Sequence, residues 1–165
     1  MLDRIVRAIR LDWTVFSEIA QDRGAMKEAA LIVAIVSFLS AVGTGIARSS
    51  FGAFIGDWLA GILLGWIGWA IITYFVGTRM FNGDTDIAEM LRVLGYANAP
   101  ILLGLLGFIG CIGWVFTLVG GLLALGAAIL AIREAMDLAT ENAIVTAVIG
   151  WVIYIAVRGA IFLIF

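Results

Sequence analysis

Long apolar runs dominate the chain, and charged residues fall almost entirely between them. The uncharged runs cover residues 29–47, 58–78, 93–132 and 143–157. A helix that crosses the hydrocarbon core of a membrane needs about 20 apolar residues. Two of the runs match one crossing each, the third is long enough for two, and the fourth begins another.

We therefore predict an all-α polytopic membrane bundle with five transmembrane helices, at residues 29–47, 58–78, 93–110, 113–132 and 143–164. The break between the third and fourth helices is placed at Gly110–Gly113, because glycine permits a tight turn. Arg158 falls near the end of the last span, where a long side chain can reach the interface. The first four predicted spans contain no acid or base.

The basic residues assign the two sides of the predicted bundle. Eight of the 10 Lys and Arg residues lie before the first span, between the second and third, or between the fourth and fifth. Cytoplasmic loops carry an excess of Lys and Arg. We therefore expect the N-terminus inside and the C-terminus outside. Because the N-terminus lacks an apolar signal-peptide core, we expect no cleaved signal.

Residues 1–28 form a cytosolic segment ahead of the membrane domain at 29–165, and together they are expected to make a single domain. The segment has an apolar stripe at helical spacing, made by Leu2, Ile5, Val6, Ile9, Trp13 and Phe16. This amphipathic pattern predicts an interfacial helix on the anionic inner leaflet. The alternative is a helix that packs over the cytosolic end of the bundle. Asp22 is a candidate N-cap for the helix that enters the first span.

The two other cytosolic segments also carry local signals. Asn82-Gly83 is typical of a turn, and Asp86 followed by Glu89 has the spacing of a capping box. Residues 133–142 are expected to extend the fourth helix into the cytosol. Arg133 and Asp137 would then pair at i and i+4.

Composition excludes several functional classes. The chain is 64% apolar and 13% charged, which does not fit a soluble domain. It has no histidine and one cysteine, so histidine-based catalysis, cysteine-rich metal sites and intrachain disulfides are absent. No nucleotide-binding or hydrolase motif occurs. We therefore predict a protein that is not an enzyme and has no cofactor or metal, and the formal charge of −2 predicts no nucleic-acid partner.

The stretch from Tyr74 to Pro100 contains a motif of ordered, spaced residues. A Gly-Thr-Arg ends one span, an acidic turn follows, and an Arg-x-x-Gly-Tyr-x-x-x-Pro enters the next. Its members are Gly77, Thr78, Arg79, Arg92, Gly95, Tyr96 and Pro100. This pattern resembles the Yip family, the integral membrane proteins named for interacting with Ypt/Rab GTPases.

The resemblance covers nearly the whole chain. The stretches FSEIAQDRGAMKEA (16–29) and AIREAMDLATENAI (131–144) are similar to the small prokaryotic members. The family implies five spans with the N-terminus inside, and a prokaryotic-type member implies the cytoplasmic membrane. Eukaryotic members bind prenylated Rab GTPases in vesicle traffic.

Polar residues at the predicted cytosolic helix ends form the candidate site. The proposed cluster contains Arg79, Arg92, Tyr96, Asn98, Pro100, Arg133 and Asp137. Within it, Arg92, Tyr96 and Asn98 would line a polar pocket beside a kink at Pro100. Such a cluster would bind a lipid phosphate or a partner. The alternatives are simple anchoring of the bundle, and an Asn98 that only bonds backbone freed by the proline.

Two functional classes follow. The first is a membrane-organising or trafficking-like scaffold that binds membrane lipids, a protein partner or a second copy of the chain at its cytosolic face. The second is an oligomeric channel or small-solute transporter. Transporters usually carry ionisable groups within their spans. The scaffold is therefore ranked first.

Overall fold

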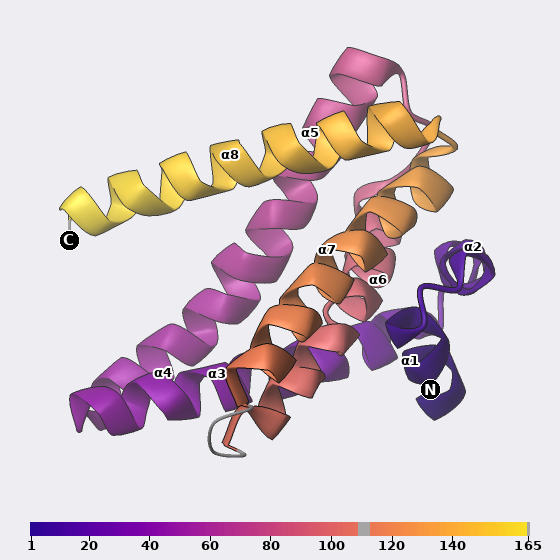
Figure 1. Cartoon of the computed structure of the whole chain (residues 1–165). Helices are drawn as coiled ribbons and strands as arrows, with labels where there is room; N and C mark the ends of the chain where they lie inside the picture. The colour runs from indigo at the N-terminus through magenta and orange to yellow at the C-terminus, as the bar shows by residue number, and fades with distance from the viewer. Residues whose placement is uncertain (109–112, 165) are drawn as a thin grey trace.

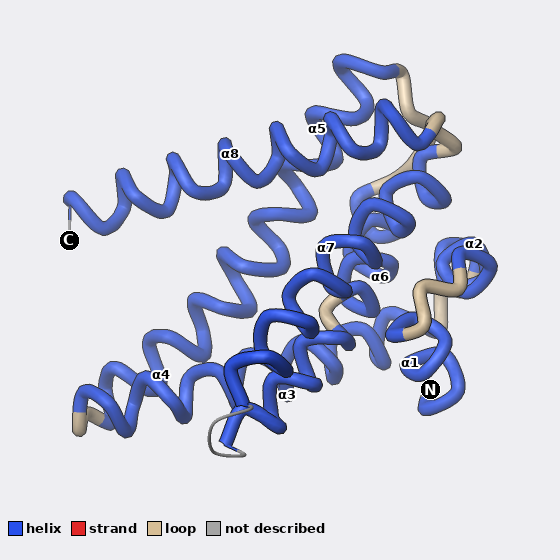
Figure 2. The backbone as a smooth tube through the Cα atoms, viewed as in Figure 1, coloured by secondary structure: helices blue, strands red, loops and turns tan. Residues whose placement is uncertain are grey.

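The computed structural model describes residues 1–108 and 113–164, and all regular structure in them is helical (Figures 1 and 2). The elements are α1 (Leu2–Ile9), α2 (Trp13–Gln21), α3 (Ala25–Arg48), α4 (Phe51–Ala60), the π-helix η1 (Gly61–Gly68), α5 (Trp69–Phe81), α6 (Ile87–Ala97), the 3-10 helix η2 (Ala99–Phe108), α7 (Gly113–Met136) and α8 (Thr140–Ile164). The all-α class is confirmed.

Four helical stretches in the described part of the chain are long and apolar enough to cross a membrane. They are Ala25–Val42, Phe51–Phe81, Gly113–Met136 and Thr140–Val157. The second begins earlier than the predicted residue 58. The Ser50 side-chain oxygen caps this helix by accepting the Ala53 N–H at 3.2 Å. The helix therefore starts at this cap and not at the residue that follows Asp57. Asp57 therefore lies in the same helical stretch as the second predicted span, one residue before that span begins.

The third predicted span is not one helix. α6 ends at Ala97, and η2 continues from Ala99 as a 3-10 helix. Pro100 has no N–H, so the α-helical hydrogen-bond pattern cannot pass through it. The predicted break at Gly110–Gly113 falls largely outside the described residues, and α7 begins at Gly113.

The N-terminal segment is also divided. A single helical stripe from Leu2 to Phe16 was expected, but Leu11 has a left-handed backbone with φ 59° and separates α1 from α2. Phe16 is fully buried, whereas the Leu2 side chain is 73% exposed. The segment thus packs through α2 and leaves one face of α1 open.

One end of the bundle gathers α1, α2, the loop between α5 and α6, and the loop between α7 and α8 (Figure 1). The N–H of Asp84, in the loop between α5 and α6, donates to the Met136 carbonyl at the end of α7 at 3.3 Å. α2 contacts both α6 and α7. We call this the basic end, because eight of the 10 basic residues lie there, on or beside α1 and α2 and the adjoining parts of α3, α5, α6 and α7, together with most of the acidic residues. The turn between α3 and α4 lies at the opposite end (Figure 1).

Glycines let the helix backbones approach closely. A Cβ on Gly95 of α6 would lie 2.7 Å from the Ala29 Cβ of α3. On α5 and α8, a Cβ on Gly150 would lie 3.0 Å from the Thr73 hydroxyl. Thr73 is fully buried, so α5 and α8 pack through small residues, as membrane helices commonly do.

Two adjacent glycines of α7 test this packing. A Cβ on Gly120 would lie 2.8 Å from the Pro100 carbonyl oxygen, whereas a Cβ on Gly121 would meet nothing within 4 Å. We expect Gly120→Ala to destabilise the protein by about 1–3 kcal/mol, because backbone must move. Gly121→Ala should be neutral or slightly stabilising through its higher helix propensity. Thermal unfolding in detergent compares the two, and equal melting temperatures would contradict the packing.

Candidate functional site

The guanidinium of Arg92 binds the end of another helix. Arg92 is 7% exposed on α6. Its Nε donates to the Ile19 carbonyl at 3.3 Å, and its Nη2 donates to the Ala20 carbonyl at 2.5 Å. These carbonyls belong to the last turn of α2, where intrahelical donors run out and the helix dipole is negative. Arg92 therefore neutralises and caps the C-terminus of α2, which fixes α2 against α6.

A second set of polar contacts joins α6 to α3 one turn further along. The Tyr96 hydroxyl donates to Glu28 Oε2. Glu28 also lies 3.7 Å from Arg4 Nη1 and 3.7 Å from the N-terminal amine. Arg4 in turn pairs with Asp22 at 2.8 Å. We call Arg4, Asp22, Glu28, Arg92 and Tyr96 the docking cluster, because it ties α1, α2 and α3 to α6.

Arg7 organises the turn between α1 and α2. Its Nε lies 2.8 Å from Asp12, and its two terminal nitrogens donate to the two carboxylate oxygens of Glu18 at 3.0 and 2.8 Å. Such a bidentate pair fixes geometry as well as charge. Asp12 also caps α2 through the Thr14 N–H at 3.0 Å. These contacts fix the angle between α1 and α2, which are separated by the left-handed residue Leu11.

The carboxylates of this region are stabilised in their charged form. The hydrogen bond from Arg4, followed by that from the Gly24 N–H, holds the pKa of Asp22 below its ordinary value. The Arg7 guanidinium lowers the pKa of Glu18. Thr14 and then Arg7 lower the pKa of Asp12. All three groups are therefore ionised near neutral pH.

Asn98 and Pro100 are not part of the docking cluster. The Asn98 amide donates to the Leu94 carbonyl at 2.8 Å, while the Asn98 N–H turns to Gly95. The carbonyl that this amide bonds belongs to Leu94, whereas an N–H at position 100 of a regular α-helix would serve Tyr96. The residue lines a cavity among α3, η1 and α8, away from the helix ends bound by Arg92. The expected pocket of Arg92, Tyr96 and Asn98 is thus divided, because Arg92 is held by α2.

The remaining predicted residues also separate. Arg79 is exposed at the end of α5. Arg133 binds Glu134 at 2.6 Å and lies 5.8 Å from the ring centre of Trp13. Asp137 has φ 50° and ends α7, so the expected i,i+4 pair with Arg133 does not form. α7 stops at Met136 where an extension to residue 142 was expected.

Asp22 and Asp86 lie beside helix starts. Asp22 follows α2, and its Oδ1 accepts the Gly24 N–H at 2.9 Å just ahead of α3. Asp86 caps α6 by accepting the Glu89 N–H at 2.6 Å, which confirms the predicted cap. Arg4, Arg7 and Glu28 were not singled out from the sequence. Their main partners lie on or beside other helices. A helical-wheel pattern shows only which residues share a face of one helix, so it does not reveal these contacts.

Four cations at the basic end lie on the surface. Arg10, Arg23, Lys27 and Arg79 are exposed, and none has an ion-pair partner among the described residues. We call these four residues the open cations. Arg4 and Arg7 pair with the acidic residues of the N-terminal segment, Asp12, Glu18 and Asp22 among them. Leu2, Val6 and Trp13 add exposed apolar side chains on α1 and at the start of α2.

Chemically, this end of the molecule offers exposed cations and apolar side chains, alongside exposed carboxylates such as Asp3 and Asp84. Among the described residues, no group of His, Cys, Asp and Glu side chains could hold a metal ion. The open cations suit an anionic group, and the exposed side chains of α1 suit a membrane interface.

Replacing Arg92 tests the attachment of α2. Arg92→Met leaves two helix-terminal carbonyls without their cation, so we expect the docked state of α2 to lose about 2 kcal/mol, a roughly 30-fold shift. Hydrogen exchange of the peptide covering α2, followed by mass spectrometry, measures this loss. Arg79→Met removes an exposed cation and should leave the exchange unchanged. Equal exchange in both variants would contradict the capping role.

Acid should release the N-terminal helices. Because the folded pKa values of Asp12, Glu18 and Asp22 are lowered, their contribution is complete above the ordinary carboxyl pKa of about 4 and is lost as the pH falls below it. Spin labels at the exposed positions Leu2 and Ala88, in a Cys111→Ser background, report the distance from α1 to α6. The distance should stay constant from pH 8 to 5 and broaden below about pH 4. A distribution unchanged in acid would contradict this.

Comparison with known proteins gives one match. The family model described as the Yip1 domain matches residues 14–161, from α2 into α8. No curated protein and no solved structure matches the chain. The match covers most of the sequence and agrees with the motif between Tyr74 and Pro100. The chain is therefore an integral membrane protein that belongs to the Yip1-domain family.

Proposed function

We propose that this protein is a non-enzymatic, membrane-organising scaffold that binds anionic phospholipid headgroups at its basic end. The observation that carries the proposal is the division of the cations there. Arg4, Arg7, Arg92 and Arg133 are used within the fold, whereas the open cations are not. The open cations form no ion pair within the described part of the chain, so their charge remains available to lipid phosphates.

The proposed topology has five crossings. α6 and η2 together extend about 36 Å at the rises of α- and 3-10 helices, which is sufficient to cross a hydrocarbon core of about 30 Å. With this fifth crossing, the basic end is the cytosolic side under the positive-inside rule. The membrane would be the prokaryotic cytoplasmic membrane, with the C-terminus outside.

The exposed face of α1 supports lipid as the occupant. Leu2 and Val6 are one helical turn apart, and Arg10 follows after another turn at the end of the helix. Apolar side chains with a cation beside them match the depth profile of a leaflet, where acyl chains lie below phosphates. A protein partner at the same face is the competing outcome.

Matched pairs of charge removals test the proposal. Each Lys or Arg near an anionic surface contributes about 1 kcal/mol, so Arg10→Gln with Lys27→Gln should weaken phosphatidylglycerol binding about 30-fold. The control pair, Arg48→Gln with Arg158→Gln, removes the same charge from the parts of α3 and α8 that lie away from the basic end. Native mass spectrometry in maltoside detergent counts bound phosphatidylglycerol against phosphatidylcholine.

The two pairs distinguish the outcomes. Loss of the phosphatidylglycerol preference in the first pair alone supports the lipid site. No preference in the unmodified protein, or equal loss in both pairs, would contradict it. Retained lipid preference in the first pair, with loss of a copurifying protein, would assign the open cations to a protein partner.

The channel or small-solute transporter is the second candidate function. A single observation favours it, namely a cavity in the middle of the bundle that is bordered by two irregular helical segments. Irregular backbone at membrane depth is tolerated where it is buried in protein or lines a water-filled cavity.

A further inference from the structure

A cavity of about 340 Å³ lies in the middle of the helices, away from the docking cluster. Its walls come from α3, α4, η1, α8 and the junction of α6 with η2. The lining residues used below are Ser37, Ser40, Asp57, Trp66, Asn98 and Tyr154. We call it the central cavity.

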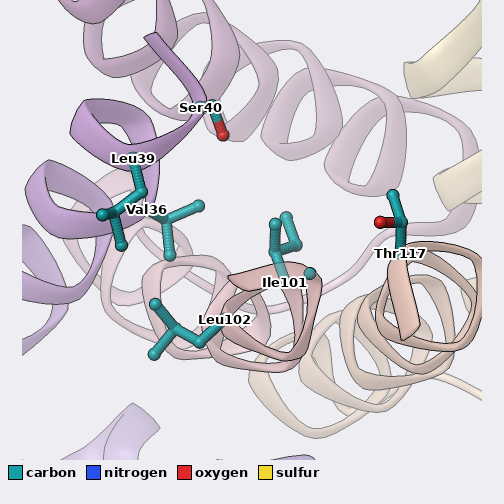
Figure 3. A pocket seen from close by; sticks show the side chains of 7 residues that line it. Val36, Leu39, Ser40, Ile101, Leu102 and Thr117 are labelled. Carbon is teal, nitrogen blue, oxygen red and sulfur yellow. The ribbon is translucent and has the colours of Figure 1, made fainter. Parts of the chain in front are cut away.

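Two further hollows join the central cavity. One of about 320 Å³ shares Gly65, Asn98, Ile101 and Tyr154 with it and adds Trp69 and Trp151. Another of about 180 Å³ shares Val36, Ser40 and Ile101 with it. Figure 3 shows this smaller hollow, with the Ser40 and Thr117 hydroxyls facing it from opposite sides. The three hollows therefore lie next to one another along several helices.

Both irregular segments of the bundle border the central cavity. The π-helix η1 contributes Gly61, Gly65 and Trp66. The break between α6 and η2 contributes Asn98 from the other wall. π-Helical turns and interrupted helices occur frequently at functional sites, because they present backbone groups that a regular helix conceals. Two such segments facing one space indicate a binding site there.

The break supplies hydrogen-bond acceptors. Pro100 has no N–H to offer the Ala97 carbonyl, and the Ile101 N–H donates to Asn98 at 3.0 Å. Ala97 lines the hollow that joins the central cavity. The Asn98 amide NH₂ donates one of its two hydrogens to the Leu94 carbonyl, so the amide oxygen and the second N–H remain. The hydroxyls of Ser37 and Ser40 add two groups that can accept as well as donate.

The charge of the cavity is negative. Asp57 lines it and lies about 10 Å along the helix from the Ser50 cap, inside a span. None of the described lining residues of the three hollows is basic, and Asp57 forms no ion pair with a described residue. An acidic side chain within a span usually serves an ion or substrate.

Aromatic rings complete the lining. Trp66 and Tyr154 border the central cavity, and Trp69 and Trp151 border the joined hollow. Trp66 is held by a 2.9 Å hydrogen bond from its Nε1 to the Leu91 carbonyl. Ring faces attract organic cations, and this attraction increases when water is excluded.

We propose that the central cavity binds a small organic ammonium compound, with Asp57 as its counter-ion and the aromatic rings around its apolar surface. A bare alkali ion fits less well, because hard cations require several oxygen ligands at close range and gain little from a large, ring-lined space. A neutral solute would leave the Asp57 carboxylate without compensation.

Choline and its neutral isostere 3,3-dimethylbutan-1-ol test the charge requirement. The two probes share shape and hydroxyl group and differ in the charge of one atom. Saturation-transfer NMR on the protein in uncharged maltoside micelles measures both affinities. We expect choline to bind about tenfold more tightly or better. Equal binding of the two probes would overturn the proposal without any substitution in the protein.

Asp57→Asn tests the counter-ion. It keeps the shape of the side chain and should reduce choline binding about tenfold or more, with no effect on the neutral probe. Asp84→Asn is the matched control, because Asp84 is exposed in the loop between α5 and α6. Thermal unfolding verifies that each variant is folded. Choline binding unchanged in folded Asp57→Asn would overturn the proposal.

Two further outcomes would also overturn it. Arg158 follows Tyr154 by one turn on α8. Choline binding that occurs only in the Arg158→Gln variant would show that Arg158, and not a ligand, is the cation that accompanies Asp57. Sodium chloride is added at the same concentration as choline, with an uncharged osmolyte as the control. Displacement of choline by sodium chloride but not by the osmolyte would assign the cavity to alkali ions. The proposal expects neither, and both experiments use the full-length protein.

Discussion

Close approach of helix backbones is the constraint on which this bundle depends. Lipid tails are as apolar as the helices, so no hydrophobic force drives the spans together, and contact has to come from packing at short range. Gly95 meets Ala29 and Gly120 meets Pro100 at distances that leave no room for a Cβ. The contact between Gly120 and Pro100 holds η2 against α7. This contact supports η2, because a 3-10 helix has poorer hydrogen-bond geometry than an α-helix.

The same close contacts leave space elsewhere. Gly61 approaches Ser37 so closely that a Cβ there would lie 2.8 Å from its hydroxyl, and η1 begins at that residue. The helix becomes a π-helix where it touches α3, and Trp66 of this segment and Asp57 just before it line the central cavity. Charge is thus divided between two regions, with an acid inside the bundle and the open cations at the basic end. The two regions can act independently, because they share no lining residue.

Much of the fold could be predicted from the spacing of charged residues alone. Particular residues show which features this spacing does not predict. The uncharged runs locate α3, α5, α7 and α8, because ionisable groups are costly in lipid. The same criterion begins the second span after Asp57, whereas the helix itself starts at the Ser50 cap, seven residues earlier. The candidate site was harder to predict. Arg92 was identified as important, but its partner is a helix terminus created by the left-handed turn at Leu11, which no periodicity encodes.

The contact between Arg92 and α2 also sets an order of events during synthesis. The residues it joins are 73 positions apart, so α2 leaves the ribosome well before its cation exists. At about 5–20 residues per second, the delay is roughly 4 to 15 s. Throughout that interval α6 is not yet available to pack against the apolar side of α2, which includes Phe16 and Ile19. The membrane surface is then the non-aqueous environment that this side can contact. The first helices of the chain are therefore among the last to reach their final place.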